Sequence, residues 1–419
     1  MSRIRVEGGS PLNGELEIQG SKNAILPILA ATILIAGESV LRNCPDITDV
    51  QETLYLMKKL GCKVEADRDV LWIDATEITS EEVTDKATAN SRISVMLLAA
   101  LIGRKKHAIA SYPGGCTIGC RPINLHLDAL RRMGVVVLET QGMVQCDAKY
   151  LSGTRICFPK VSVGATETVI LASVLSEGIV RIQNAACEPE ICHMCDFLRR
   201  CGACIFGDGS KNITIKGVKK LFPCEYRIPA DRIVCGTYLL AAAATKGTIL
   251  LRNVIPCEIK PVLDILKECG CCVQCDKEEI VLKSVARLRA VPYTQTDAFP
   301  GFPTDMQSQL CALLCVADGP SMIRETIFEG RFHVVPELRK MGASIEVSDD
   351  VLLIEGVNGL SGKCVEAKEL RGSAALLIAG LIADGTTIVD TDKYLKRGYQ
   401  DIVGDLQQLG AKIELISSV

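Results

Sequence analysis

The chain has 419 residues, enough for two or three domains that each bury a hydrophobic core of their own. Hydrophobic residues make up 48% and charged residues 23% of the composition, as in ordinary folded proteins, so we expect no long disordered segment. The net charge of −3 lacks the basic excess that nonspecific binding to a nucleic acid requires, so nucleic acid is not an expected partner.

The sequence predicts neither a secretory signal nor a membrane span. Its first ten residues, MSRIRVEGGS, contain no apolar segment. The apolar stretch from Ala24 to Gly37 is shorter than the roughly 20 residues of a membrane-spanning helix. We therefore expect a cytoplasmic protein without membrane insertion.

A short pattern recurs six times along the chain: an apolar residue, two polar residues, an apolar residue and a glycine. Its glycines are spaced about 70 residues apart, at Gly61, Gly134, Gly202, Gly270, Gly342 and Gly410. Each one follows an amphipathic helical stretch, as a glycine just beyond a helix does. A β-rich run begins three residues later in every copy. The pattern predicts six α/β units.

A second glycine in each unit ends an Ala/Leu-rich helix and precedes a short β run. These glycines are Gly37, Gly103, Gly178, Gly247, Gly319 and Gly385. Only the second unit has about seven extra residues between its two glycines. They fall in a glycine- and proline-rich loop around residues 111–119, and insertions confined to one repeat usually map to functional loops. The repeat spacing thus selects Cys116 as a candidate functional residue.

The Ala/Leu-rich helices begin at charged or polar residues. These residues are Lys22, Arg92, Ser162, Arg232, Asp305 and Arg371. Helix N-termini present unpaired N–H groups and the positive end of the helix dipole, so a cluster of six would bind phosphates and carboxylates. The alternative is that these residues only cap their helices and contact solvent. Taken together, they predict an anionic ligand.

The 21 cysteines are expected to be mostly reduced and buried, because their number is odd and no secretory signal is predicted. Two pairs, Cys192/Cys195 and Cys201/Cys204, suggest a zinc site with His193. Only five residues separate the pairs, whereas a zinc ribbon has about 15 to 20 between them. We therefore favour packing and expect no bound metal.

Other familiar chemistries have little support in the sequence. The four histidines form no H-E-x-x-H motif, and no phosphate-binding G-x-x-x-x-G-K-[ST] or strand-borne G-x-G-x-x-G occurs. Cys116 and His126 could form a protease-like pair, but no orienting third group is evident. An enzyme and a binding protein both remain open at this point, and we expect no cofactor.

The loop around Cys116 continues as PGGCTIGCRPINLHL (residues 113–127), which resembles the catalytic loop of the UDP-N-acetylglucosamine 1-carboxyvinyltransferase family. The likeness continues in order through GSKNAILPILAA (20–31), VSVGATET (161–168), EPEI (188–191), PTDMQSQ (303–309), ETIFEGRF (325–332) and KRGYQDI (396–402). It therefore covers essentially the whole chain.

The resemblance implies an α/β (α+β) protein with the enolpyruvyl transferase or EPSP synthase-like fold, a two-domain inside-out α/β barrel of six βαβαββ-type repeats. One three-repeat domain would span residues 22–229 and carry the cysteine loop at about 111–121. The other would combine residues 1–21 with 230–419 and carry a catalytic aspartate and C-terminal arginines. The active site would lie in the cleft between the domains.

The implied reaction transfers the enolpyruvyl group of phosphoenolpyruvate to the 3-hydroxyl of UDP-N-acetylglucosamine, with release of phosphate, at the start of peptidoglycan synthesis. Cys116 would protonate the methylene carbon, and Asp305 would accept the hydroxyl proton. The other implied phosphoenolpyruvate contacts are Lys22, Arg121 and Arg397 to the anion, Arg331 and Arg371 to the carboxylate, and Asn23 to the reacting centre. The epoxide antibiotic fosfomycin, which mimics phosphoenolpyruvate, would alkylate Cys116.

The resemblance also implies positions that hold the UDP-sugar. These are Arg92, Arg121, Pro122, Ile123, Asn124, Leu125, Lys160, Ser162, Val163, Gly164, Asp305 and Ile327. Two functional alternatives remain open: a 5-enolpyruvylshikimate-3-phosphate synthase, which shares the fold but has no loop cysteine in this role, and a catalytically impaired UDP-sugar-binding paralogue. The second is suggested by Asn124 and Glu369, which both replace the family's usual Asp. The oligomeric state is left open.

Overall fold

The computed structural model describes residues 2–84, 93–112, 123–140, 142–284, 286–391 and 393–417. The chain divides into two compact units. We call residues 1–19 with 230–419 the terminal unit, and the described residues between 20 and 229 the inserted unit. Each unit buries a hydrophobic core of its own.

The inserted unit contains three four-stranded sheets, in the orders β14-β3-β5-β4, β6-β7-β9-β8 and β10-β11-β13-β12. Their strands are β3 (Glu38–Arg42), β4 (Lys63–Asp67), β5 (Val70–Asp74), β6 (Glu82–Val83), β7 (His107–Ser111), β8 (Val136–Thr140), β9 (Met143–Asp147), β10 (Arg155–Cys157), β11 (Ile179–Gln183), β12 (Cys204–Phe206), β13 (Asn212–Lys216) and β14 (Glu225–Arg227). Each sheet combines one parallel pair with two antiparallel pairs.

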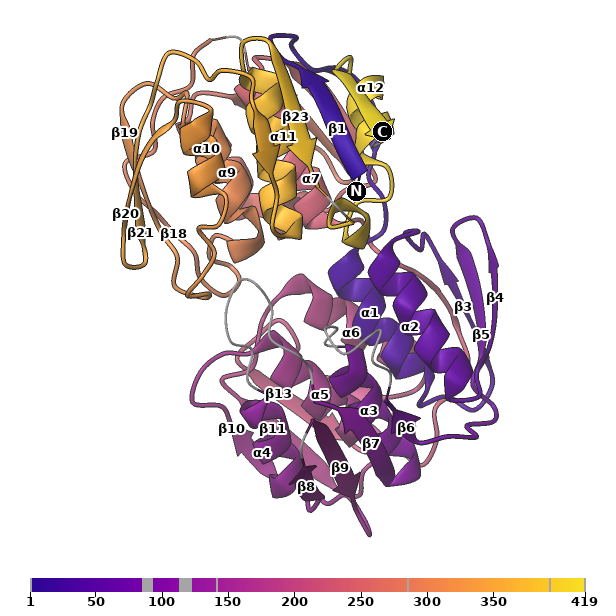
Figure 1. Ribbon diagram of the computed structural model, residues 1–419. Helices are drawn as coiled ribbons and strands as arrows, with labels where there is room; N and C mark the ends of the chain where they lie inside the picture. Colours follow the sequence, from indigo (N-terminus) through magenta and orange to yellow (C-terminus); the bar gives the residue numbers. More distant parts are fainter. Residues whose placement is uncertain are drawn as a thin grey trace. The chain divides into compact units, whose positions relative to one another are not determined.

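The terminal unit repeats this plan in the sheet orders β16-β17-β15-β2, β18-β19-β21-β20 and β22-β23-β1-β24. Its strands are β1 (Ser2–Glu7), β2 (Asn13–Glu17), β15 (Thr248–Arg252), β16 (Cys272–Cys275), β17 (Glu279–Lys283), β18 (Thr294–Gln295), β19 (Pro320–Arg324), β20 (Ser344–Ser348), β21 (Val351–Glu355), β22 (Cys364–Glu366), β23 (Thr386–Asp390) and β24 (Lys412–Ser417). The N-terminal strand β1 lies between β23 and β24 near the C-terminus (Figure 1). The six predicted α/β units are therefore present in the described chain.

Two kinds of helix alternate in each unit. The apolar helices are almost fully buried and pack against one another at the centre of their unit: α1 (Lys22–Thr32), α3 (Ile93–Lys105) and α5 (Val163–Ser173) in the inserted unit, and α7 (Arg232–Ala244), α9 (Gln307–Leu314) and α11 (Leu370–Ile382) in the terminal unit. The other helices bury only one face: α2 (Thr48–Lys59), α4 (Asn124–Arg132), α6 (Pro189–Arg200), α8 (Lys260–Glu268), α10 (Val335–Lys340) and α12 (Ile402–Gln408). Short 3₁₀ turns are η1 (Pro256–Ile259), η2 (Thr304–Met306) and η3 (Leu395–Arg397).

The helix-ending glycines of the repeat are confirmed. The residues concerned are Gly61, Gly134, Gly202, Gly270, Gly342 and Gly410, whose φ angles range from 89° to 104°. Each lies one residue beyond the C-cap of a half-buried helix, and a strand begins two residues later. Only glycine adopts this left-handed backbone without steric strain, which is why the glycine recurs.

Gly103 corrects one detail of the predicted repeat. We expected it to end its helix, but it lies inside α3, and the left-handed residue after that helix is Lys106, with φ 67°. A Cβ on Gly103 would lie 2.8 Å from the carbonyl oxygen of Leu171 in α5. This glycine therefore permits two buried helices to approach closely, a packing role that the sequence pattern does not reveal.

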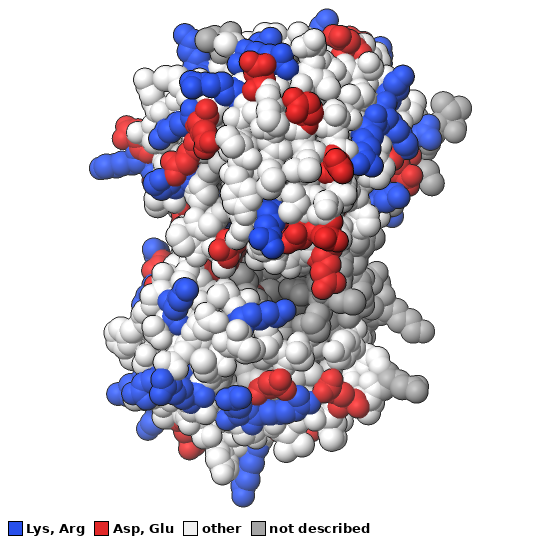
Figure 2. Space-filling view, turned by 90° about the vertical axis from the view of Figure 1, so that its left-hand side faces the viewer, with Lys and Arg blue, Asp and Glu red and all other residues white. Residues whose placement is uncertain are grey.

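No helix among the described residues is long and apolar enough to cross a membrane. On the face shown in Figure 2, lysine and arginine side chains are interspersed with acidic and uncharged ones. This mixture agrees with the net charge of −3 and shows no broad surface of one sign on that face.

Gly356 provides a test of the close packing within one repeat. It follows β21, and a Cβ at this position would lie 1.8 Å from the carbonyl oxygen of Ala317. Gly356→Ala should therefore lower the free energy of unfolding by about 2 kcal/mol or more, measured by denaturant titration. Gly359→Ala, in the same connection, is the matched control, because the nearest atom to its Cβ would be 3.8 Å away. Equal stability of the two variants would contradict this packing.

Candidate active site

Two arginines from different segments of the terminal unit bind one carboxylate, that of Asp305 in η2. Arg371, the second residue of α11, donates from Nη2 to Asp305 Oδ2 at 2.8 Å. Arg331, in the turn between β19 and α10, donates from Nη2 to Asp305 Oδ1 at 2.7 Å. Asp231, which caps α7 by accepting from the Ile233 N–H, is close enough to act electrostatically on Arg371. The structure thus brings three predicted site residues together.

The charges in this cluster are deeply buried. The side chains of Arg331 and Arg371 are only 3% and 5% exposed, whereas that of Asp305 is 26% exposed. Burial alone would raise the pKa of Asp305, but the charges and hydrogen bonds of Arg371 and Arg331 outweigh it and hold this pKa well below its ordinary value. Asp305 is therefore an ionised carboxylate whose two oxygens are both occupied by guanidinium groups.

Glu369, a departure from the family's usual Asp, has a clear structural role. It is the N-cap of α11, and its carboxylate accepts from the N–H groups of Arg371 (2.7 Å) and Gly372. A carboxylate at this position neutralises the helix terminus and fixes the first turn. The longer side chain of Glu369 therefore still caps the helix that carries Arg371.

Thr304 and Glu325 belong to the same cluster and were not identified from the sequence. The Thr304 hydroxyl accepts from Arg331 Nη1 at 2.8 Å and donates to Glu325 Oε2 at 2.8 Å. Both residues lie within motifs of the resemblance, PTDMQSQ and ETIFEGRF, which was the available signal. The same loop carries Ile327, whose side chain is exposed, while Arg397 ends η3, which packs against α11.

In the inserted unit, Lys22 is the first residue of α1 and forms an ion pair with Asp49 of α2, with 2.8 Å between Nζ and Oδ2. The two side chains are only 13% and 6% exposed. Ser21 caps α1 by accepting from the Ala24 N–H, which leaves Lys22 and the half-buried Asn23 in the first turn. Asp49, which no sequence motif indicated, therefore fixes the ammonium group of Lys22.

The predicted UDP-sugar residues of the inserted unit lie at two further helix starts. Ser162 caps α5 by accepting from the Ala165 N–H at 3.3 Å, and Lys160 just before it is exposed. Gly164 lies against the imidazole of His126, since a Cβ there would be 2.8 Å from Nε2. The remaining residues are Val163, the first of α5, and Ile123, Asn124 and Leu125 at the start of α4, where Ile123 is buried and Asn124 exposed. Cys116, Arg92, Arg121 and Pro122 lie outside the described residues.

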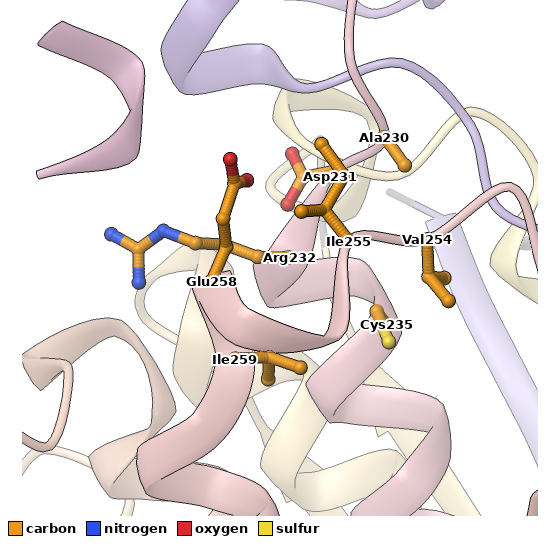
Figure 3. Close-up of a pocket in the computed structure, with 8 residues that line it drawn as sticks. All are labelled: Ala230, Asp231, Arg232, Cys235, Val254, Ile255, Glu258 and Ile259. Carbon is orange, nitrogen blue, oxygen red and sulfur yellow. The ribbon is translucent and has the colours of Figure 1, made fainter. Parts of the chain in front are cut away.

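A small hollow near the start of α7 is lined by Ala230, Asp231, Arg232, Cys235, Val254, Ile255, Glu258 and Ile259. Figure 3 shows the Arg232 side chain directing its guanidinium away from Cys235. The hollow has a volume of about 10 Å³, scarcely enough for one water molecule, so it is not a site for a sugar nucleotide.

One cysteine of each C-x-x-C pair occupies a packing position, while Cys192 and Cys204 are partly exposed. Cys195 and Cys201 are fully buried in the core of the inserted unit, and the sulfur of Cys201 lies 3.3 Å from that of Cys224. Burial raises the pKa of Cys195 well above its ordinary value, which opposes the thiolate form that binds zinc. Within the described ranges, no three His, Cys, Asp or Glu side chains are grouped so as to hold a metal ion.

Comparison with known proteins identifies the family. A protein from Caldanaerobacter subterraneus subsp. tengcongensis named UDP-N-acetylglucosamine 1-carboxyvinyltransferase 2 is 44% identical to this chain and aligns over 99% of both chains. One from Actinobacillus succinogenes named UDP-N-acetylglucosamine 1-carboxyvinyltransferase is 43% identical over the full length of both. The chain belongs to this family. The family model for EPSP synthase (3-phosphoshikimate 1-carboxyvinyltransferase) also matches residues 6–406.

Solved structures support the same conclusion about the fold. The enolpyruvyl transferase NikO from Streptomyces tendae superposes with a TM-score of 0.87 and 26% identity, covering 100% of both chains. An EPSP synthase from Acinetobacter baumannii superposes with a TM-score of 0.75 and 18% identity over 100% of both, which shows a common fold only. The resemblance, the enolpyruvyl transferase fold and the expectation of a transferase are thereby confirmed.

Asp305 should contribute measurably to stability. Asp305→Asn removes the charge shared by two buried guanidinium groups and should lower the free energy of unfolding near neutral pH by about 3 kcal/mol. Because the folded-state pKa of Asp305 lies below its unfolded value, this contribution is fully present above about pH 4 and is lost as the pH falls through the folded-state pKa. The difference between wild type and variant should therefore be constant from about pH 7 to 5 and shrink in stronger acid.

Denaturant titrations at several pH values measure this difference. The control is Asp318→Asn, which breaks an exposed ion pair with Arg287 (3.5 Å, with Asp318 73% exposed) and should change stability by less than about 0.5 kcal/mol. If Asp305→Asn changed the free energy of unfolding as little as this control does, the ion pairs of Asp305 with Arg331 and Arg371 would not stabilise the fold as predicted.

Proposed function

We propose that this protein transfers the enolpyruvyl group of phosphoenolpyruvate to the 3-hydroxyl of UDP-N-acetylglucosamine, releasing phosphate, as the first committed step of peptidoglycan synthesis in the cytoplasm. The observation that carries the proposal is the ionised Asp305 between two buried arginines, at a helix start in a chain whose full-length relatives are named for this activity. No cofactor is required.

The chemistry needs groups from both units. Addition of the sugar hydroxyl to the enol carbon requires a proton at the methylene carbon and a base for the hydroxyl proton. We assign these roles to Cys116 of the inserted unit and Asp305 of the terminal unit. Loss of phosphate and of a methyl proton from the resulting adduct then regenerates the double bond. Lys22, Arg121 and Arg397 bind the phosphoenolpyruvate anion, and Asn23 donates a hydrogen bond at the reacting centre.

The state of Asp305 suggests how substrate binding activates it. With both oxygens paired to arginine, this carboxylate is a weak base, because its pKa is held well below the ordinary value. A phosphoenolpyruvate carboxylate that pairs with Arg331 and Arg371 takes over these two guanidinium groups. Asp305 then loses the interactions that depress its pKa and becomes a stronger base when the acceptor is present.

The UDP-sugar is held by residues at two helix starts and in the neighbouring loops. Ser162, Val163 and Gly164 offer the N-terminus of α5, and Ile123 to Leu125 offer that of α4, both suited to anionic phosphates. Lys160 and Arg92 supply cationic side chains, Pro122 lies beside Arg121, and the exposed Ile327 provides an apolar contact for the nucleotide. Asn124, the first residue of α4, replaces the family's usual Asp, so the affinity for the UDP-sugar is the property that we expect to differ most from the family.

Phosphate release tests the acceptor directly. The purified chain with phosphoenolpyruvate should release phosphate when UDP-N-acetylglucosamine is added, and much less when shikimate 3-phosphate is added. The converse preference would favour the EPSP synthase alternative. UDP-sugar binding without phosphate release, measured by calorimetry, would instead favour an impaired paralogue.

Substitution of Cys116 tests the proton donor. A carboxylic acid can donate a proton if partial burial raises its pKa, whereas a serine hydroxyl is far too weak an acid. Cys116→Asp should therefore retain turnover and escape alkylation by fosfomycin, and Cys116→Ser should lose turnover. Peptide mapping of the inhibited wild type should locate the adduct on Cys116, faster when UDP-N-acetylglucosamine is present. An adduct on another cysteine, or normal turnover of Cys116→Ser, would exclude the assigned role.

A further inference from the structure

Glu325 is a buried carboxylate beside the residues that we expect to contact substrate. Glu325 is only 3% exposed, and its carboxylate accepts four hydrogen bonds. The donors are the hydroxyls of Thr296 (3.0 Å) and Thr304 (2.8 Å) and the N–H groups of Ile327 (2.9 Å) and Phe328 (3.1 Å). Burying a carboxylate costs free energy unless it is hydrogen-bonded. These contacts therefore fix the positions of Thr304 and of the backbone at Ile327 and Phe328.

Two of the four donors act on Arg331. The single hydroxyl proton of Thr304 is directed to Glu325, so its lone pairs are left to accept from Arg331 Nη1 at 2.8 Å. The ring of Phe328, whose N–H is bonded to Glu325, lies 5.1 Å from the guanidinium carbon of Arg331. Glu325 therefore orients the guanidinium both at its edge and at its face.

Neither of these routes passes through Asp305, which binds the other terminal nitrogen, Nη2, of Arg331. If Asp305 were the sole anchor, its release on substrate binding would leave a buried arginine free to change rotamer. A guanidinium that is already fixed loses less conformational freedom when it binds a planar carboxylate. The contacts of Glu325, Thr304 and Phe328 thus keep Arg331 in position while its partner changes from Asp305 to the substrate carboxylate.

We propose that Glu325 and Thr304 are positioning residues that hold the guanidinium of Arg331 in place for the carboxylate of the enolpyruvyl donor. The inference rests on the proposed function, since it takes phosphoenolpyruvate as that donor. Glu325 has a second effect, because it also fixes the backbone of Ile327, a predicted contact of the UDP-sugar. The two positioning residues should therefore differ in which substrate they influence.

Thr304→Val in the full-length chain tests the first route, because valine keeps the shape of threonine and removes the hydroxyl. We expect kcat/KM for phosphoenolpyruvate to fall about 10- to 100-fold, as for loss of a hydrogen bond to a charged group, with KM for UDP-N-acetylglucosamine changed less than about twofold. Thr304→Ser should restore most of the activity.

Thr326→Val is the matched control. It removes the threonine hydroxyl of the residue next to Glu325, and that hydroxyl donates to the backbone carbonyl of Thr296 at 2.6 Å and has no bond to Arg331 among the described contacts. This variant should retain kcat/KM for phosphoenolpyruvate within about threefold, as expected for a hydroxyl outside the Arg331 network.

The pH dependence of kcat/KM gives a readout that loss of packing alone would not change. Asp305 faces Arg331 and Arg371, and Arg371 in turn is influenced by Tyr399 and Asp231. Loosening Arg331 weakens one of the two interactions that depress the pKa of Asp305. The acidic limb of the Thr304→Val profile should therefore move to higher pH than in wild type.

Glu325→Gln tests the second route, because the amide keeps the shape but cannot accept at all four contacts. KM should rise for both substrates, and amide hydrogen exchange at Ile327 and Phe328 should accelerate. The exchange measurement needs no activity, so it reports on the Glu325 contacts even if wild type releases no phosphate and the proposed function fails.

The proposal is overturned if Thr304→Val matches wild type in kcat/KM for phosphoenolpyruvate, or if Thr304→Ser is as impaired as Thr304→Val. Unchanged exchange at Ile327 and Phe328 in Glu325→Gln would also overturn it. If the acidic limb of the Thr304→Val profile did not shift and the variant were only less thermally stable, Thr304 and Glu325 would have a structural role and the proposal would be wrong.

Discussion

The double ion pair of Asp305 is the constraint on which the rest of the terminal unit depends. A carboxylate can remain ionised among buried arginines only if the 3₁₀ turn η2, the turn before α10 and the start of α11 are held in register. The buried helices α7, α9 and α11 provide that register because they pack against one another through apolar side chains. The hydrophobic core thus holds Asp305, Arg331 and Arg371 close together, whereas in an unfolded chain these charged groups would be separate and hydrated.

The six repeats show how one scaffold can carry different chemistry. Each repeat supplies the same kind of apolar helix. The residues at the N-terminus of that helix differ from repeat to repeat. Lys22 is fixed by Asp49, Ser162 caps its own helix, and Arg371 pairs with Asp305. We therefore expect functional differences between the repeats to lie at a few helix starts and in the loops beside them, with the packing of the repeat left intact.

The sequence was most informative where local backbone geometry determines the residue. The six glycines after the half-buried helices were predictable, because a left-handed residue is required at each. The assignment of Gly103 as a helix-ending glycine was wrong. A glycine is needed there because α5, nearly 70 residues further along the chain, packs closely against α3 at this position. Asp305 was found through its motif, yet its two arginine partners and the Glu325–Thr304 support depend on tertiary contacts that no local pattern specifies.

The pairing of β1 has a consequence for how the chain folds during synthesis. Arg3 is paired with Asp390 and Arg5 with Glu414, so β1 is translated well before both of its partner strands. The sheets of the inserted unit draw all their strands from between residues 20 and 229, so this unit can complete its core while the remainder is still being translated. The sheet that contains β1 must wait for β23 and β24, so β1 stays unpaired and exposed to wrong partners until those strands are made, whereas β2 can pair with β15 much earlier. A chain truncated near its C-terminus would accordingly release a folded inserted unit attached to an incomplete and aggregation-prone terminal one.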